Sequence, residues 1–192
     1  MALDSRAAAA RVIGDVLAGK SLNQALPPRL DRVTQRDRGL LQQLCFGTLR
    51  HEPRLQAVLD QLLNKPLKTK DSDIIGLLLC GLYQLESTRI PDHAAVASTV
   101  NAVTSLKKPW ARGMTNAVLR RYLRERKELT EALDQASSAS HPAWLYYKLL
   151  RQWPATGPAV LEANNQQPPM TLRVNTRVAN RSECLRALAE AG

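Results

Sequence analysis

The segment that most restricts the fold is residues 74–87, IIGLLLCGLYQLES. Drawn as an α-helix, it is apolar on almost every side, so no side of it suits water. No apolar run in the chain approaches the length of a membrane span, and charged residues interrupt every stretch. A helix of this kind needs other elements around it, and we expect residues 74–87 to be the central buried helix of a bundle.

Residues 4–137 predict the surrounding helices, joined by short connections. Apolar residues make up 44% of the chain and aromatic residues only 4%, and the abundance of leucine and alanine favours helix over sheet. Apolar residues recur at helical spacing in several segments. These stripes are Ala8, Val12 and Val16; Leu40, Leu41, Leu44, Cys45 and Leu49; and Leu55, Val58, Leu59, Leu62 and Leu63. The predicted fold class is mainly α.

The character of the chain changes after residue 138. An amphipathic helix is predicted after Pro142, and a second short helix runs into a proline-ended linker. Residues Thr171–Asn175 are the one convincing strand, because Leu172 and Val174 alternate with polar residues. One strand and one helix cannot close a sheet. We therefore divide the chain into a helical domain, 1–138, and an incomplete α/β subdomain with its linker helices, 139–192.

Positive charge is concentrated in one stretch. The chain has a formal charge of +10, and residues 107–127 hold eight basic residues against one acidic residue. On the predicted helix 114–127, Arg120, Arg124 and Lys127 lie opposite the apolar side, and basic residues also flank Trp110 in the preceding loop. Cations beside an aromatic ring are typical of nucleic-acid binding. The predicted RNA-binding residues are Lys107, Lys108, Trp110, Arg112, Arg120, Arg121, Arg124 and Lys127; the alternative is a solvated helix face.

Residues that carry out chemistry are not evident. No two glycines are separated by a single residue, so there is no Gly-x-Gly phosphate loop, and the histidines lack metal-ligand spacing. His93 is interpreted as a helix-start residue, Asp71 and Asp73 as helix N-caps, and Cys45 and Cys80 as small core residues. We predict no catalytic, cofactor-binding or metal-binding residue. The N-terminus lacks the pattern of a signal peptide, and the three cysteines are expected to be reduced, which predicts a cytoplasmic location.

Two blocks of sequence resemble known families. RDRGLLQQLCFGTLR, LLLCGLYQLESTRIPDHAAVASTVNAV and GMTNAVLRRYLR resemble the helical domain of the transcription antitermination factor NusB. HPAWLYYKLLRQWP and EANNQQPPMTLRVN resemble the segment that follows a NusB-like domain in the ribosomal RNA small subunit methyltransferase B family of bacterial cytosine methyltransferases. The pairing of the two blocks covers essentially the whole chain.

This resemblance implies an RNA-binding helical bundle and a partner, small-subunit ribosomal RNA. It also implies a catalytic domain beyond Gly192 that binds S-adenosylmethionine on a Rossmann-like sheet and uses a cysteine nucleophile. Cys45, Cys80 and Cys184 lack the Pro-Cys or Thr-Cys setting of that family, so none inherits a catalytic role. The chain is thus expected to resemble the N-terminal part of the enzyme, inactive alone, with no cofactor, metal or membrane of its own, and able to contact the catalytic domain.

Three functions remain open from the sequence. The leading hypothesis is an RNA-binding region that positions ribosomal RNA for methylation. The second is a stand-alone NusB-type antitermination factor with a ribosomal-protein partner, and the third is a structural helical adaptor whose charge is incidental. Arg120 also has two interpretations, because the NAVLR motif that contains it suits either a phosphate contact or a salt bridge between helices.

Overall fold

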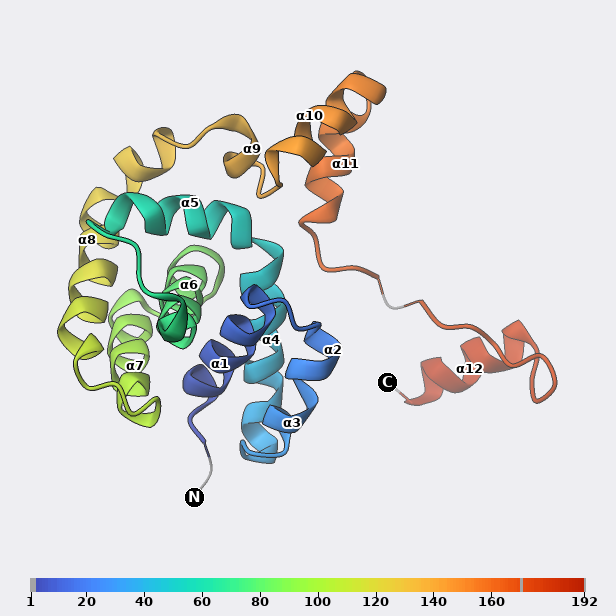
Figure 1. Ribbon diagram of the computed structural model, residues 1–192. Helices are drawn as coiled ribbons and strands as arrows, with labels where there is room; N and C mark the ends of the chain where they lie inside the picture. Colours follow the sequence, from blue (N-terminus) through green and yellow to red (C-terminus); the bar gives the residue numbers. More distant parts are fainter. Residues whose placement is uncertain (1–2, 170, 192) are drawn as a thin grey trace.

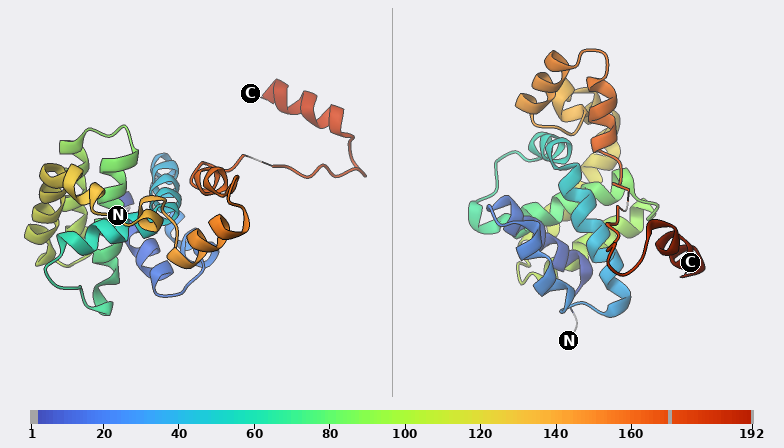
Figure 2. Two further views of the ribbon diagram at one scale, coloured as in Figure 1. Left: turned by 90° about the horizontal axis from the view of Figure 1, so that it is seen from above. Right: turned by 90° about the vertical axis from the view of Figure 1, so that its right-hand side faces the viewer.

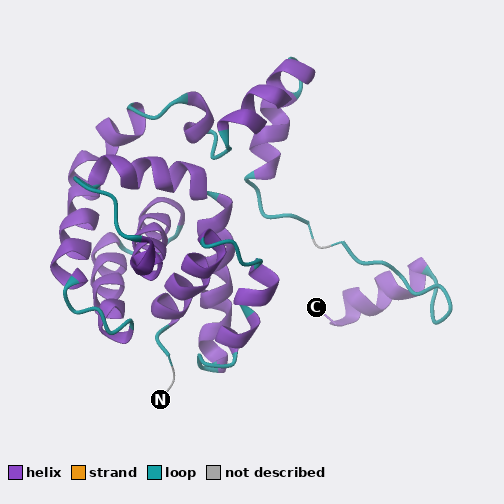
Figure 3. Ribbon diagram, in the orientation of Figure 1, coloured by secondary structure: helices purple, strands orange, loops and turns teal. Residues whose placement is uncertain are grey.

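The computed structural model describes residues 3–169 and 171–191. Over these residues the secondary structure is helical, as Figure 3 shows. The central helix is α6 (Ser72–Ser87), and α1 (Ser5–Leu17), α4 (Arg38–Arg50), α5 (Glu52–Leu62), α7 (Asp92–Ser105) and α8 (Ala111–Glu131) surround it (Figure 1). Shorter helices α2 (Leu22–Ala25) and α3 (Pro27–Leu30) follow α1. The predicted mainly α fold is confirmed.

Helix α6 forms the core as the sequence predicted. Ile74, Leu77, Leu78, Leu79 and Leu82 are fully buried, and buried residues lie on every side of the helix. Burying a large aliphatic side chain contributes about 1.5–3 kcal/mol, so this one helix supplies a large part of the free energy that favours folding. The surrounding helices are held in place because each covers one part of its surface.

Small residues bring α1 and α6 unusually close. Ala7, Ala8, Ala9 and Ala10 are completely buried on α1. A Cβ atom added at Gly14 would lie 2.8 Å from the Ser72 carbonyl oxygen, and one added at Gly76 would overlap the Ala10 carbonyl oxygen. The two helix backbones therefore touch directly, and glycine at these positions is required by space.

Buried polar groups connect the same helices. The Gln84 side chain, completely buried on α6, accepts a 2.8 Å hydrogen bond from Arg6 Nε on α1 and donates one of 3.2 Å to Thr99 Oγ1 on α7. Arg11 of α1 donates to the Ser105 carbonyl oxygen at the end of α7. Because a buried polar group costs free energy unless it is paired, these bonds favour one arrangement of α1, α6 and α7.

A second network joins α5, α6 and α8. Tyr122, buried on α8, donates its hydroxyl to Glu86 Oε1 at 2.9 Å, and Arg54 Nε donates to Glu86 Oε2 at 2.9 Å. Arg126 donates to the Tyr122 hydroxyl and to the Leu85 carbonyl oxygen. Burial, and next the nearby negative charge of Glu86, raise the pKa of Tyr122 to about 12. This network holds the basic helix α8 against the core.

The linker helices extend from one side of the bundle. They are α9 (Gln135–Ser138), α10 (Ala143–Gln152) and α11 (Gly157–Asn164), and Figure 2 shows α10 and α11 projecting together. Hydrogen bonds hold their base: His51 of the bundle lies 3.4 Å from the Ser140 hydroxyl, and Asn165 donates to the Ala139 carbonyl oxygen at 2.8 Å.

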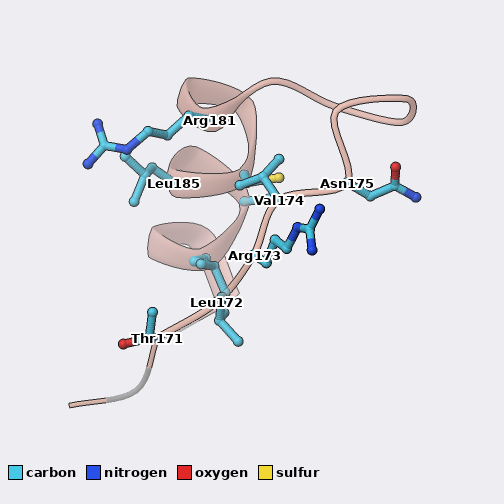
Figure 4. Close-up of a pocket in the computed structure, with 10 residues that line it drawn as sticks. Thr171, Leu172, Arg173, Val174, Asn175, Arg181 and Leu185 are labelled. Atoms are coloured by element: carbon cyan, nitrogen blue, oxygen red, sulfur yellow. The ribbon is translucent and has the colours of Figure 1, made fainter.

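The predicted strand at Thr171–Asn175 is not formed. The segment is an unpaired connection that leads to α12 (Arg181–Ala191) (Figure 4). A strand needs a neighbour for its ladder hydrogen bonds, and among the described residues no other segment is paired with it. Leu172, Leu185 and Leu188 remain about half exposed around a pocket of about 690 Å³. The division at residue 138 stays a prediction.

The close contact between α1 and α6 predicts a specific cost for a single methyl group. Replacing Gly76→Ala should lower the free energy of unfolding by about 1–3 kcal/mol, because the new Cβ meets the rigid backbone of α1. Urea unfolding measures the change. Gly113→Ala on α8 is the matched control: nothing lies within 4 Å of a Cβ there, so it should stabilise the helix by up to about 1 kcal/mol. An equal effect at both positions would contradict this account.

The raised pKa of Tyr122 predicts how stability depends on pH. The phenol stays neutral in the folded state up to a pKa of about 12 but ionises near pH 10 when exposed by unfolding. The Tyr122 phenol therefore contributes roughly 2–3 kcal/mol to the free energy of unfolding below pH 10. This contribution is lost as the pH rises from 10 toward 12. Tyr122→Phe should flatten this part of a stability–pH profile, whereas Tyr147→Phe, at an exposed position, should not.

Candidate nucleic-acid interface

Helix α8 presents its apolar side to the bundle, as the sequence predicted. Val118, Leu119 and Tyr122 are buried, and Met114 and Leu123 pack beside them. The backbone leaves helical geometry at Glu125, where φ is −110° and ψ is 16°. Arg112, Arg120, Arg124 and Lys127 are exposed. At about 100° per residue, Arg112, Arg120 and Arg124 span roughly a third of the helix circumference, and Lys127 lies beyond the break at Glu125.

The loop before α8 is shaped by a left-handed residue. Lys107 has a φ of 60°, and the amides of Lys107 and Lys108 donate to the Thr104 and Val103 carbonyl oxygens at the end of α7. This is the usual geometry by which a helix ends, although a lysine there costs about 1–2 kcal/mol more than a glycine. The turn leaves Lys107 exposed, sends Lys108 back toward α6, and brings Trp110, which is 54% exposed, to the start of α8.

Lys108, predicted as an RNA-binding residue, is paired with two carboxylates of its own chain. Its Nζ atom lies 2.6 Å from Asp73 Oδ1 and 2.9 Å from Asp71 Oδ1, and it also donates to the Lys70 carbonyl oxygen. Burial would lower the pKa of Lys108, but the hydrogen bonds and charges of Asp73 and Asp71 outweigh it and raise the pKa. Lys108 therefore anchors the loop to the start of α6. Asp71 is the N-cap residue of α6, as predicted, whereas Asp73 lies in the first turn; both carboxylates pair with Lys108.

Arg121 also bonds within the protein. Its guanidinium donates to Glu125 Oε2 at 2.7 Å and to the carbonyl oxygens of Gln61 and Leu62, at the C-terminal end of α5. A cation at that end also complements the helix dipole. The contact between helices that the sequence left open for Arg120 is thus made by Arg121. Arg120 instead donates to Asn116 Oδ1 one turn earlier on α8, at 3.0 Å.

Two of the predicted cations, Arg112 and Arg120, border a groove between α7 and α8. The groove has a volume of about 540 Å³, and Arg112 and Arg120 line its α8 side with Asn116. His93 and Asn101 line the α7 side, above a floor that includes Val96 and Val100; Asp92 also lines it. The guanidinium groups suit a phosphate, and the amide groups beside the apolar floor suit a base. We call this feature the α7–α8 groove.

Sequence reasoning missed part of this groove. His93 was interpreted only as a helix-start residue, and Asn101 and Asn116 were not singled out. The available signal was that both asparagines lie inside predicted helices, where asparagine is a weak helix former, and that each precedes Ala-Val. Nothing in the sequence showed that the two Asn-Ala-Val segments would lie on opposite sides of one groove.

Arg124 and Lys127 extend the basic surface beyond the groove. Arg124 is 3.9 Å from Glu125, and Lys127 is 3.9 Å from Glu131; their side chains are 67% and 81% exposed. Exposed pairs at this distance contribute about 0–1 kcal/mol, so they leave both cations able to bind a phosphate. Arg124 also lines a second hollow of about 600 Å³ between α8 and the end of α5.

The family model of the NusB family matches residues 3–124. The chain belongs to the NusB family. A second model, described as the ferredoxin-like domain of Methyltr_RsmF/B-like proteins, matches residues 141–192. The matched ranges cover the helical bundle with most of α8, and the part of the chain that holds α10 to α12.

Curated relatives match nearly the whole length of this chain. Each of three is called ribosomal RNA small subunit methyltransferase B. The protein of Pseudomonas putida is 52% identical over 99% of the chain and 44% of its own length. That of Pseudomonas syringae pv. tomato is 49% identical over 99% and 43%, and that of Yersinia pestis bv. Antiqua is 45% identical over 97% and 44%. The chain spans less than half the length of these relatives.

Other side chains that could carry chemistry lie apart from the groove. Cys45 and Cys80 are fully buried, and burial raises the pKa of both thiols, that of Cys80 to about 12, which confirms them as core residues. In the described part of the chain, no group of three or more potential ligand residues could hold a metal ion. Among the same residues, no helix is both long and apolar enough to cross a membrane.

The Lys108 contacts predict that replacing this residue lowers the stability of the fold. Lys108→Ala should lower the free energy of unfolding by about 2 kcal/mol, because Asp71 and Asp73 lose their shared cation while partly buried. Urea unfolding measures this. Lys107→Ala is the matched control, since the neighbouring side chain is exposed and should change stability by less than about 0.5 kcal/mol. If Lys108→Ala and Lys107→Ala were equally stable, Lys108 would not anchor the loop.

Proposed function

We propose that the chain is the RNA-binding region of a ribosomal RNA cytosine methyltransferase. In this role the α7–α8 groove and the basic surface beyond it bind small-subunit ribosomal RNA and position it for methylation by a domain outside these residues. The observation that carries the proposal is the placement of Arg112 and Arg120 in one groove, with Arg124 and Lys127 exposed further along α8. The names of the relatives supply the reaction and the substrate class.

S-adenosylmethionine is the methyl donor implied for such an enzyme. The described residues do not fit this cofactor: they provide no strand followed by a phosphate- or nucleotide-binding loop and a helix, the element that a Rossmann-like sheet uses. We therefore assign no step of methyl transfer to residues 3–169 or 171–191. Their proposed task is to bind and orient RNA, in the cytoplasm where bacterial ribosomal RNA is made.

The groove can hold RNA by two kinds of contact. Arg112 and Arg120 provide donors in a planar arrangement that matches phosphate oxygens. The Oδ1 atoms of Asn101 and Asn116 accept hydrogen bonds from Arg112 at 3.4 Å and from Arg120 at 3.0 Å, and the two amide NH2 groups remain to donate to the edge of an unpaired base. Trp110, exposed at the start of α8, offers a surface for stacking. Binding of this kind depends strongly on salt, because each phosphate contact releases counterions.

One further observation favours a different function. The NusB family match covers 3–124, and the factor that the helical sequence blocks resemble acts in transcription antitermination. A stand-alone factor of this type would bind a ribosomal-protein partner through the bundle. Residues 141–192 favour the methyltransferase instead, because they match a domain of methyltransferase proteins. A pull-down that retained a ribosomal protein as the main specific partner would revive the antitermination hypothesis.

The groove predicts a change in the salt dependence of RNA binding. Arg112→Ala combined with Arg120→Ala should weaken binding of single-stranded ribosomal RNA fragments. It should also reduce the slope of log K against log salt by about 0.7 for each lost contact. Fluorescence anisotropy at several salt concentrations measures both quantities.

The control for this experiment removes the same charge elsewhere. Arg36→Ala combined with Lys68→Ala replaces two exposed basic residues on other elements. This pair should leave the slope nearly unchanged. Lys108→Ala should also leave it unchanged, because that ammonium is already held by carboxylates. If the groove pair and the control pair had equal effects, net charge alone would explain the binding, and the structural adaptor would be the better hypothesis.

A further inference from the structure

Helix α10 has two sides of different chemistry. Leu145, Tyr146, Leu149 and Leu150 are partly buried, and Tyr146 and Leu150 border a hollow shared with Pro158 and Leu161 of α11. The other side carries Trp144, Tyr147, Lys148 and Arg151, all exposed. These four follow the helical spacing i, i+3, i+4 and i+7, so they form one stripe roughly 10 Å long. We call this stripe the α10 aromatic–basic face.

The aromatic rings of this face are open to solvent. Trp144 is 69% exposed and Tyr147 is 56% exposed. Tyr147 meets the ring of Tyr146 edge to face, with centroids 5.2 Å apart and planes at 87°. That contact orients the Tyr147 ring and leaves it accessible. Exposing two large rings side by side is costly in water, and the helix does so although its leucines are turned inward.

The cations of this face have no anionic partner. Helix α10 contains no acidic residue. Throughout the described chain, the side chains of Lys148 and Arg151 form neither an ion pair nor a hydrogen bond, whereas Lys108, Arg121, Arg124 and Lys127 all lie near carboxylates. A surface of rings and unpaired cations is complementary to unpaired bases and phosphates. Exposed Trp, Tyr and Arg also occur at protein interfaces, so the observation that favours a polyanion here is the absence of any acidic residue on α10.

We propose that the α10 aromatic–basic face is a second RNA-binding surface, which takes a single-stranded segment. Bases stack on Trp144 and Tyr147, whose Cβ atoms are about 5–6 Å apart at this spacing, while Lys148 and Arg151 contact the adjoining phosphates. A duplex would hide the base faces, so the surface discriminates in favour of unpaired RNA. This inference rests on the proposed RNA-binding function and extends it from the NusB-like bundle to the region 141–192.

Two variants of the full chain test the surface. Trp144→Ala combined with Tyr147→Ala should weaken binding of an unpaired ribosomal RNA oligonucleotide about fivefold or more, and should affect a duplex of the same sequence less. Lys148→Gln combined with Arg151→Gln should reduce the slope of log K against log salt by about 1.4. Both pairs change exposed side chains only, and circular dichroism verifies that the helices remain.

The matched control is a tryptophan at the end of the same helix. Trp153→Ala removes an equally large ring that is 52% exposed at the C-terminal end of α10 but lies outside the stripe, and it should leave affinity unchanged. In a chain with Trp110→Phe and Trp153→Phe, Trp144 is the one tryptophan left, and its fluorescence should be quenched by the unpaired oligonucleotide.

The possible outcomes separate this inference from the proposed function. If the two α10 variants bind RNA as the unaltered chain does, while Arg112→Ala with Arg120→Ala weakens binding, the α10 surface does not bind RNA and the inference fails alone. If the unaltered chain binds no RNA, both proposals fail. Loss of affinity in the α10 variants, with the Trp153→Ala control unchanged, supports the inference.

Discussion

The burial of α6 is the constraint on which the rest of the structure depends. A helix with apolar residues on every side is stable only when other helices cover it, and α1, α4, α5, α7 and α8 do so. The α7–α8 groove follows from this arrangement, since α7 and α8 both pack on α6 as neighbours. The exposed cations of α8 can gather on one side because its opposite side is fixed to the core.

Charge on this protein has two separate uses. Arg54, Lys108, Arg121 and Arg126 bind carboxylates and carbonyl oxygens of their own chain, and these contacts hold α5, α6 and α8 together. Arg112, Arg120, Arg124 and Lys127 remain at the surface. The residues that bind RNA in our proposal are therefore a subset of the basic residues, selected by geometry. The number of basic residues in the sequence is larger than the number that is free to bind RNA at the surface.

The two RNA surfaces that we propose differ in their chemistry. The α7–α8 groove combines guanidinium and amide groups in a hollow, whereas the α10 aromatic–basic face combines open rings with cations on a convex helix. The first suits a bound nucleotide and its phosphate, and the second suits stacking along an unpaired strand. They lie in parts of the chain that match different family models. Together they would contact a longer piece of RNA than either could alone.

The sequence by itself determined the helical fold, the central position of α6 and the apolar side of α8, because helical periodicity and burial are local properties of the chain. It also indicated which stretch is basic. Only the tertiary structure decided which cations remain exposed, since the carboxylate partners of Lys108 and the α5 carbonyl partners of Arg121 lie far away in sequence. It also left Thr171–Asn175 without a strand, because strand pairing requires a neighbouring segment that alternation in one segment cannot supply.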